Sequence, residues 1–342
     1  PTMSATFSVP PARNGSMSDI DWAESFNLSA CEYWGEGDRI VTLVNNIRDI
    51  NFYDPLDPDG NFVVGGFFST VYTFLTDRYV MTIDAFDWLH GTGENPPDDQ
   101  GSPLYQACAD YLERPDLFSS KPHRYESIFA HEYMHLLQSY TGTKNLWADE
   151  GMADYAAQYV VYNKNNALRD PNDEGFPERL AKFLGFWEQE EFGGPEQSLT
   201  AWGDQGPSEM HADYGCAFSF FLYLNGRFGL SFLQDFAADP VVIGISDLQI
   251  VLDRGGINVT VQQVIKDYLV ALAVAGEITT GATVIGKLSE DLSLPDMSMS
   301  KINWNTPQAY NSSGAPSNGA DFVRLRSDIE YLEANYITSL RF

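Results

Sequence analysis

The sequence predicts an α+β protein in which a β-rich N-terminal part precedes a mainly helical part. Segments rich in β-branched and aromatic residues are concentrated between residues 38 and 88. Apolar residues at helical spacing then dominate residues 103–285. Hydrophobic residues make up 44% of the 342 residues, so the chain can form a sizeable core. This length is typical of one large domain or two modest ones.

The N-terminal part, residues 1–102, is expected to contain a mixed β-sheet. Residues 1–35 are polar and weakly periodic, and a loop rich in Gly and Pro over residues 91–101 ends this part. Its strand-like segments are rich in Val, Ile, Phe, Tyr and Thr and are residues 39–44, 62–68 and 78–84.

The C-terminal segment, residues 286–342, is rich in turns and in strand-like sequence. Residues 311–320 consist mainly of Asn, Ser, Gly, Ala and Pro, a composition typical of an interdomain link. The residues after this link are too few for an independent β-domain. We therefore expect a short β-rich tail that packs on the helical part, unless the parent chain is longer.

The strongest indication of function is the sequence His131-Glu132-Tyr133-Met134-His135. On a helix, residues four positions apart lie on one face, so both imidazoles can reach one metal ion. Apolar residues on both sides of this motif, followed by Gly142, favour a buried helix of about four turns. Buried histidines need partners for their ring nitrogens, and a metal ion supplies one.

A second helix, expected over residues 148–160, should provide the third ligand. Glu150 falls in its first turn, where a carboxylate also interacts favourably with the helix dipole. Asp154 lies one turn later on the same face, where we expect it to accept the free ring N–H of a ligand histidine. Asp149 is the alternative ligand. The alternative is that Glu150 and Asp154 are ordinary solvent-exposed side chains of an acidic protein.

Two histidines and one carboxylate form the donor set of a catalytic zinc site, which keeps one coordination position open for water. Zinc lowers the pKa of that water to about 7, and a nearby carboxylate can take its proton. Glu132 directly follows the first histidine and is the candidate general base. The chemistry indicated is hydrolysis, most often of a peptide bond. The expected cofactor is Zn²⁺, and the expected partner is a protein or peptide substrate.

These residues resemble the gluzincin group of zinc metallopeptidases, which use two histidines and a downstream glutamate as ligands. Within that group, the hyicolysin-like secreted bacterial peptidases are the most similar. Their three elements are matched here by the His-Glu-x-x-His segment, by the Trp147 to Tyr155 segment and by the Asp213 to Leu224 segment. The resemblance covers roughly residues 60 to 275. It implies a zincin-like catalytic unit in which an edge strand borders the cleft and can bind substrate by strand addition.

A peptidase also needs a group that stabilises the oxyanion of the tetrahedral intermediate, and a Tyr hydroxyl or a His can serve. Tyr214 and His211 are the candidates, and Tyr214 is preferred because it matches the Tyr-Gly pattern of similar enzymes. The alternative for Tyr214 is an ordinary core aromatic. His90 and His123 lack a partner at ligand spacing, so we expect them to be at the surface or locally hydrogen-bonded.

Composition excludes some classes of partner. A net charge of −28 repels phosphate, so we expect no nucleic-acid partner. No apolar run is long enough for a membrane span. The acidic composition and the resemblance together favour a secreted, extracellular protein, although no signal peptide is visible. Residues 54–61 form a candidate Ca²⁺ loop, although an ordinary turn explains their sequence equally well. Cys31 and Cys108 can form a disulfide, which would leave Cys216 free.

Three functional hypotheses are consistent with the sequence. The first is a zinc endopeptidase. The second is a zinc aminopeptidase or glycopeptidase of narrow specificity. The third is a non-catalytic extracellular adhesion or binding protein in which the motif is accidental or disabled, although an intact Glu132 argues against a disabled enzyme. The sequence indicates no particular oligomeric state.

Overall fold

The computed structural model describes residues 2–18, 40–49, 64–85, 123–142, 144–162, 178–185, 194–203, 210–274 and 317–320. The strands in this part of the chain are β1 (Val41–Asn45), β2 (Gly66–Phe68) and β3 (Val80–Asp84). The α-helices described are α1 (Met3–Thr6), α4 (Thr70–Thr76), α7 (Arg124–Gln138), α8 (Leu146–Ala157), α9 (Glu178–Phe183), α10 (Met210–Phe228), α11 (Leu230–Ala238), α12 (Leu248–Arg254) and α13 (Val261–Val274). A π-helix, η4 (Gln158–Tyr162), continues α8, and a 3-10 helix, η7 (Ile245–Asp247), precedes α12.

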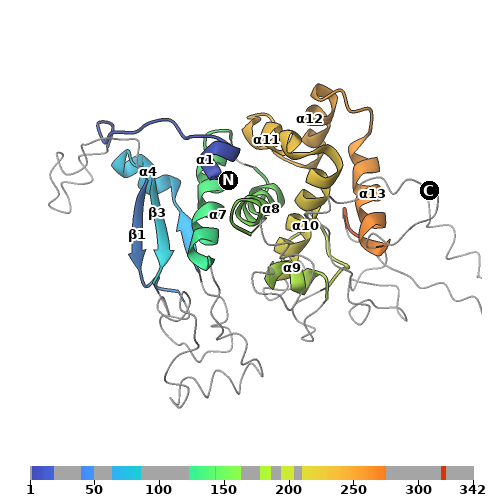
Figure 1. Ribbon diagram of the computed structural model, residues 1–342, viewed down its shortest axis with the longest axis horizontal. Coiled ribbons are helices and arrows are strands. Elements are labelled where there is room, and N and C mark those ends of the chain that lie inside the picture. Colours follow the sequence, from blue (N-terminus) through green and yellow to red (C-terminus); the bar gives the residue numbers. More distant parts are fainter. Residues whose placement is uncertain are drawn as a thin grey trace, which may run out of the picture.

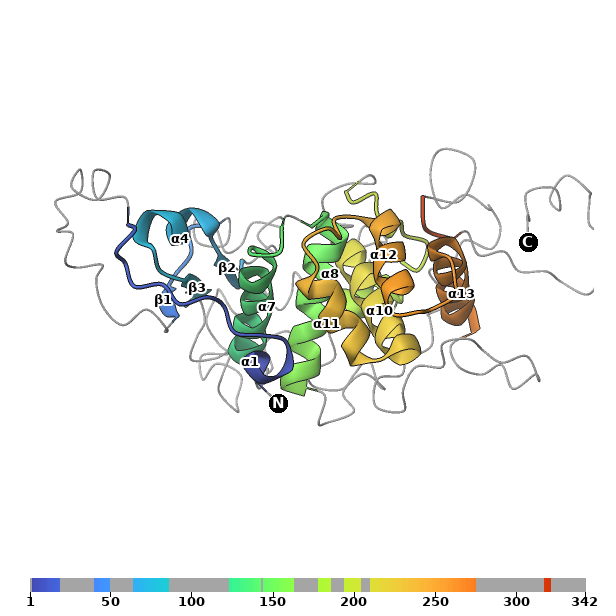
Figure 2. The ribbon, with the colours of Figure 1, turned by 90° about the horizontal axis from the view of Figure 1, so that it is seen from above.

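The sheet lies at one end of the molecule, and the helices follow it in successive layers (Figure 1). α7 packs against β2 and β3, α8 packs against α7, and α10 packs against both α8 and α9. Figure 2 shows the same succession from above, with α11 beside α10. α7 and α8 therefore lie between the sheet and helices α9 to α13 (Figure 1), so a site between α7 and α8 can receive side chains from both directions.

β3 is the central strand of the described sheet. β1 pairs with β3 in parallel, and β2 pairs with it antiparallel. β3 is buried along its whole length, whereas β1 is exposed. The predicted α+β class, with a mixed sheet followed mainly by helices, is confirmed. Each strand is shorter than the segment predicted for it, and β2 is an edge strand among the described residues.

Two helices in the part predicted to be β-rich were not anticipated: α1 and α4. The α4 sequence is rich in β-branched and aromatic residues, which favour strands. The Ser69 hydroxyl, however, accepts a hydrogen bond from the Tyr72 N–H at 3.4 Å, and Asp77 ends the helix in the left-handed conformation. These local caps stabilise a short helix despite the weak strand preference of its residues.

The N-terminal segment before β1 ties the sheet to α7. The Tyr133 hydroxyl donates to the carbonyl of Ser8 at 3.0 Å. Arg13 forms a 3.0 Å ion pair with Asp77, which lies between α4 and β3. Although this segment has little periodicity in the sequence, it holds the helix that carries the histidine motif against the sheet.

Two glycines allow close contact between the helices around the candidate site. A Cβ at Gly151 on α8 would lie 2.8 Å from the Cβ of Ala217 on α10. A Cβ at Gly215 on α10 would overlap the carbonyl group of Arg179 on α9. Since these glycines directly follow Glu150 and Tyr214, they place both candidate side chains where two helices meet.

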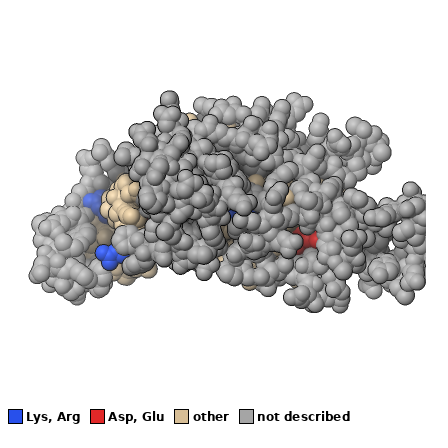
Figure 3. Space-filling view, turned by 90° about the horizontal axis from the view of Figure 1, so that it is seen from below, with Lys and Arg blue, Asp and Glu red and all other residues tan. Residues whose placement is uncertain are grey.

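Other parts of the described chain bear on the sequence predictions. Residues 317–320, within the expected interdomain link, pack against residues 198–200: the Ser198 hydroxyl donates to the Ser317 carbonyl at 2.6 Å. Tyr268 is buried on α13. Among the described residues, no helix combines the length and the apolar character needed to cross a membrane. On the face seen in Figure 3, described basic side chains lie toward the end that carries the sheet, and described acidic atoms lie toward the helical end.

Candidate metal centre

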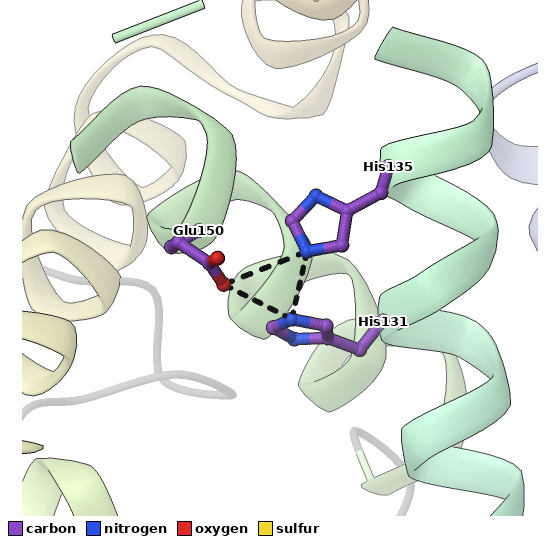
Figure 4. A group of neighbouring side chains, drawn as sticks. All are labelled: His131, His135 and Glu150. Atoms are coloured by element: carbon purple, nitrogen blue, oxygen red, sulfur yellow. Dashed lines mark hydrogen bonds and ion pairs between the residues drawn. The ribbon is translucent and has the colours of Figure 1, made fainter. Parts of the chain in front are cut away.

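α7 presents both histidines of the motif on the face turned toward α8 (Figure 4). The helix has 15 residues, in agreement with the predicted four turns. Its spacing places the two rings edge to face, with 4.7 Å between their centroids and 78° between their planes. α7 ends at Gln138, whose amide donates to the carbonyl of Asp149 at 3.1 Å. This hydrogen bond fixes the first turn of α8 beside the last turn of α7.

The side chain of Glu150 reaches from α8 to both histidines. Its Oε2 lies 3.2 Å from Nε2 of His131 and 3.5 Å from Nε2 of His135. The two Nε2 atoms are 3.0 Å apart. Donors about 2.0–2.1 Å from a tetrahedral zinc ion lie about 3.3–3.4 Å from each other. The three side chains could therefore hold one metal ion.

Each histidine also has a carboxylate beside its other ring nitrogen, Nδ1. Oδ1 of Asp154 lies 2.8 Å from Nδ1 of His131, the position expected for an acceptor that fixes the ring. Oδ1 of Asp149 lies 3.2 Å from Nδ1 of His135, although the ring N–H does not point directly at it. Asp149 thus faces the nitrogen away from Glu150 and does not join the three converging donors.

These contacts favour a cation between the rings. If each Nδ1 carries a proton for its carboxylate, the lone pairs of both Nε2 atoms face each other. Two lone pairs at such a short separation repel unless a proton or a metal ion lies between them. The arrangement of carboxylates around the rings therefore fits the donor set of a metal centre, and it explains why two histidines are placed together inside the protein.

Arg179 on α9 extends this network and was not predicted from the sequence. Its Nη1 donates to both oxygens of Asp154, at 2.9 and 3.1 Å. Its guanidinium lies over the ring of Tyr214, with 3.8 Å from Cζ to the ring centroid. Arg179 thus connects the partner of His131 to the candidate oxyanion group. Its place depends on the contact of α9 with Gly215, which no local pattern around Arg179 reveals.

The converging donors line a cavity of about 760 Å³. One wall is formed by β2 and the residues around it, and another by α9 and α10. Glu132 lies in this cavity and is buried; its Oε2 accepts a hydrogen bond from the Phe68 N–H at 2.8 Å. His211 and Tyr214 line the same cavity. The structure therefore brings together all the side chains that the sequence proposed for the site: His131, Glu132, His135, Glu150, Asp154, His211 and Tyr214.

Burial and charge shift the pKa values in this centre. Burial alone would lower the pKa of His131, but Asp154 and Glu150 raise it to about 9. The pKa of His135 is also raised, because Asp149 and Glu150 outweigh its burial. In turn, the two imidazoles lower the pKa of Glu150 against the effect of burial. The pKa of Tyr214 is raised by its burial and by the Glu150 carboxylate, so its hydroxyl keeps its proton at neutral pH.

The raised pKa of His131 predicts how the affinity of this site for a divalent metal ion depends on pH. A metal ion binds the deprotonated imidazole, so at neutral pH it must displace the proton that the metal-free ring holds. With Zn²⁺ as the probe, we expect the affinity to rise as pH increases from 6.5 toward 9, by about tenfold per pH unit for each proton displaced. Chelator-competition titrations across this range measure the slope, and an affinity that does not change with pH would contradict the prediction.

The metal-free protein should show the opposite trend in stability. His131 binds its proton more tightly in the folded state than in the unfolded chain, whose pKa is near 6.5. This stabilisation is complete below pH 6.5 and is lost as pH rises through 9. The protonation of His131 should therefore make the metal-free protein unfold at a lower temperature at pH 9 than at pH 6.5. A His131→Ala variant is the control, because it lacks this contribution to stability.

Several sequence predictions fall on residues whose structure is not described: His90, Cys31, Cys108, the candidate calcium loop at residues 54–61, and the strand-like segments after residue 320. His123 is exposed, precedes α7, and has its Nδ1 3.6 Å from Glu126. Cys216 is buried on α10 and forms no disulfide.

Comparison of the chain with models of known protein families finds no match, and comparison with curated protein sequences finds none either. The function is therefore inferred from the side chains of the centre and their chemistry.

Proposed function

We propose that this protein is a zinc-dependent metallopeptidase of the gluzincin type, with a zincin-like catalytic unit. The observation that carries the proposal is the convergence of two imidazole nitrogens from α7 and one carboxylate oxygen from α8, with Glu132 in the same cavity. A structural zinc site is usually closed by four protein ligands, whereas a catalytic site has three and one open position. The described donors number three.

The side chains have distinct roles in this proposal. His131, His135 and Glu150 hold the ion, while Asp154 keeps the ring of His131 oriented through Nδ1. When bound, zinc supplies a Lewis acid that lowers the pKa of water to about 7 and polarises a carbonyl group. Glu132 accepts the proton of the attacking water and then returns it to the leaving amine.

The position of β2 suggests how a peptide would bind. β2 is an edge strand of the described sheet and borders the cavity. An extended peptide can add to such an edge through backbone hydrogen bonds, which are independent of side-chain identity. This mode would lay the scissile bond between β2 and the metal centre. A protein or peptide substrate is therefore the ligand class that we propose, and the acidic composition together with the resemblance supports action outside the cell.

The proposal is tested by metal analysis and peptide digestion of the same preparation. We expect about one zinc ion per chain, cleavage of a mixed peptide library, loss of cleavage with a chelator, and recovery when zinc is restored. A protein that binds zinc stoichiometrically but cleaves no peptide would refute the peptidase and leave only the metal centre. A protein that binds no divalent metal would refute both.

Tyr214→Phe tests the oxyanion role. The substitution removes only the hydroxyl, so the ring can still pack beneath Arg179 and against Trp202, whose ring centroid is 4.8 Å away. We expect turnover to fall by about 10²–10³-fold, the usual cost of losing one oxyanion donor, with zinc content unchanged. Steady-state kinetics and metal analysis measure both quantities. An unaltered turnover would assign the role to His211 or to another group, for which His211→Ala is the matched variant.

A further inference from the structure

The candidate general base has a partner outside the helices that carry the metal ligands. Oε2 of Glu132 accepts a hydrogen bond from the backbone N–H of Phe68 on β2, with 2.8 Å between the two atoms. We propose that Phe68 is a positioning residue whose backbone amide fixes the Glu132 carboxylate in the cavity. The contact itself is a property of the fold, whereas its effect on catalysis rests on the proposed peptidase function.

The pairing of β2 explains why this amide is available. The N–H of Asp84 donates to the carbonyl of Gly65 at 2.9 Å, and the register then pairs Phe67 with Thr82. In an antiparallel pair, residues alternate between those that bond to the partner strand and those whose amides point away from it. Phe68 belongs to the second kind, so its N–H points away from β3. The sheet thereby holds the donor at a fixed angle and leaves it for Glu132.

Two glycines bring β2 close enough to α7 for this contact. A Cβ at Gly66 would lie 2.7 Å from Cγ2 of Ile128, and one at Gly65 would lie 2.9 Å from Cδ1 of the same side chain. Ile128 precedes Glu132 by four residues, so both side chains project from one face of α7. Consequently α7 contacts β2 twice, once through packing and once through the carboxylate. A larger residue at position 66 would separate the strand from the helix.

Holding one carboxylate oxygen has a specific consequence for the other. Oε2 is engaged by the amide, so Oε1 is the oxygen that remains for the proton of water. The Glu132 side chain also loses rotamer freedom before any substrate binds, which reduces the free-energy cost of reaching the reactive geometry.

The same contact affects where a substrate strand can pair with β2. Because the Phe68 N–H is already bonded to Glu132, a substrate strand at this edge must instead pair with Gly66, whose peptide groups also face away from β3.

Hydrogen exchange tests the contact without any assay of activity. In the metal-free protein, the Phe68 amide should exchange about tenfold or more faster in Glu132→Ala than in the wild type, because a hydrogen bond to a charged group is lost. The Phe67 amide, which faces β3, is the internal control and should change little. If exchange at Phe68 is the same in both proteins, Glu132 does not hold this amide and the proposal fails.

Kinetics then test the positioning role. Phe68→Pro removes the N–H at an edge position, where proline is tolerated, whereas Phe68→Leu keeps it. We expect Phe68→Pro to lower kcat about tenfold or more at nearly constant KM and zinc content, and Phe68→Leu to lose much less. In a Glu132→Asp background, the shorter side chain no longer reaches the amide, so adding Phe68→Pro should cause little further loss.

The possible outcomes separate the two proposals. The positioning role would be overturned if Phe68→Pro lowered kcat equally in the wild type and in Glu132→Asp. It would also be overturned if Phe68→Pro and Phe68→Leu lowered kcat equally. Either result would show that Phe68 acts only through packing. Gly66→Ala provides a second approach, since it should speed exchange at Phe68 by moving β2 from α7. If the wild type hydrolyses no peptide, the peptidase proposal fails, while the exchange results still decide the contact.

Discussion

Glu132→Gln is expected to reduce peptide hydrolysis by about 10²–10⁴-fold while zinc remains bound. Gln has nearly the same size and can still accept the hydrogen bond from the Phe68 amide through its carbonyl oxygen, so the local packing is retained. It cannot, however, accept a proton from water at neutral pH. None of the three converging donors is changed by this substitution. Turnover of a cleaved library peptide and zinc content per chain are the two measurements.

The control for this prediction is the affinity for zinc. If Glu132→Gln lost zinc as well as activity, the lower activity would result from a damaged metal centre, and Glu132 would belong with the ligands. If the variant remained fully active with zinc bound, Glu132 would have no part in proton transfer. A matched substitution in the lining of the cavity, Ser139→Ala, removes a hydroxyl that donates to the carbonyl of Leu136 and serves as a general control for mutagenesis.

Helix positions around the site could be predicted from the sequence because they depend on local patterns. The spacing of apolar residues placed α7 and the motif on it, and the second predicted helix, residues 148–160, overlaps α8 and η4. Since four-residue spacing on a helix is a geometric constant, the convergence of His131 and His135 followed directly. The orientation of Asp154 toward His131 could be expected for the same reason, because it lies one turn from Glu150.

The parts that could not be predicted depend on contacts between distant segments. Arg179 reaches Asp154 only because α9 packs on Gly215, and nothing in its own neighbourhood identifies it. The Phe68 amide is a backbone group, so no residue type marks it. Asp149 is the alternative ligand that the sequence offers; the helical turn directs its carboxylate to Nδ1 of His135, the ring nitrogen away from Glu150. Strand pairing, helix packing and side-chain direction are all long-range properties of the fold.

Glu150→Ala is expected to cause the largest loss of zinc affinity among the acidic residues of the centre. It removes the oxygen donor that lies within 3.5 Å of both Nε2 atoms, which leaves the two imidazoles as the described ligands. Alanine is a good helix former, so α8 should retain its structure and its contact with α10 through Gly151. Competition with a chelator of known affinity gives the zinc dissociation constant, and circular dichroism checks the helices.

Asp154→Ala and Asp149→Ala are the matched comparisons for this ligand assignment. Asp154 holds a ring nitrogen of His131 without converging on the ion, and loss of such a partner usually weakens metal binding by about 10–100-fold. Asp149 retains 35% exposure and a poorly aligned contact with His135, so its loss should cost least. The expected order of affinity loss is therefore Glu150, then Asp154, then Asp149. Unchanged zinc binding in Glu150→Ala, or a greater loss in Asp149→Ala, would transfer the third ligand to another carboxylate, since the order follows directly from which oxygen faces the two Nε2 atoms.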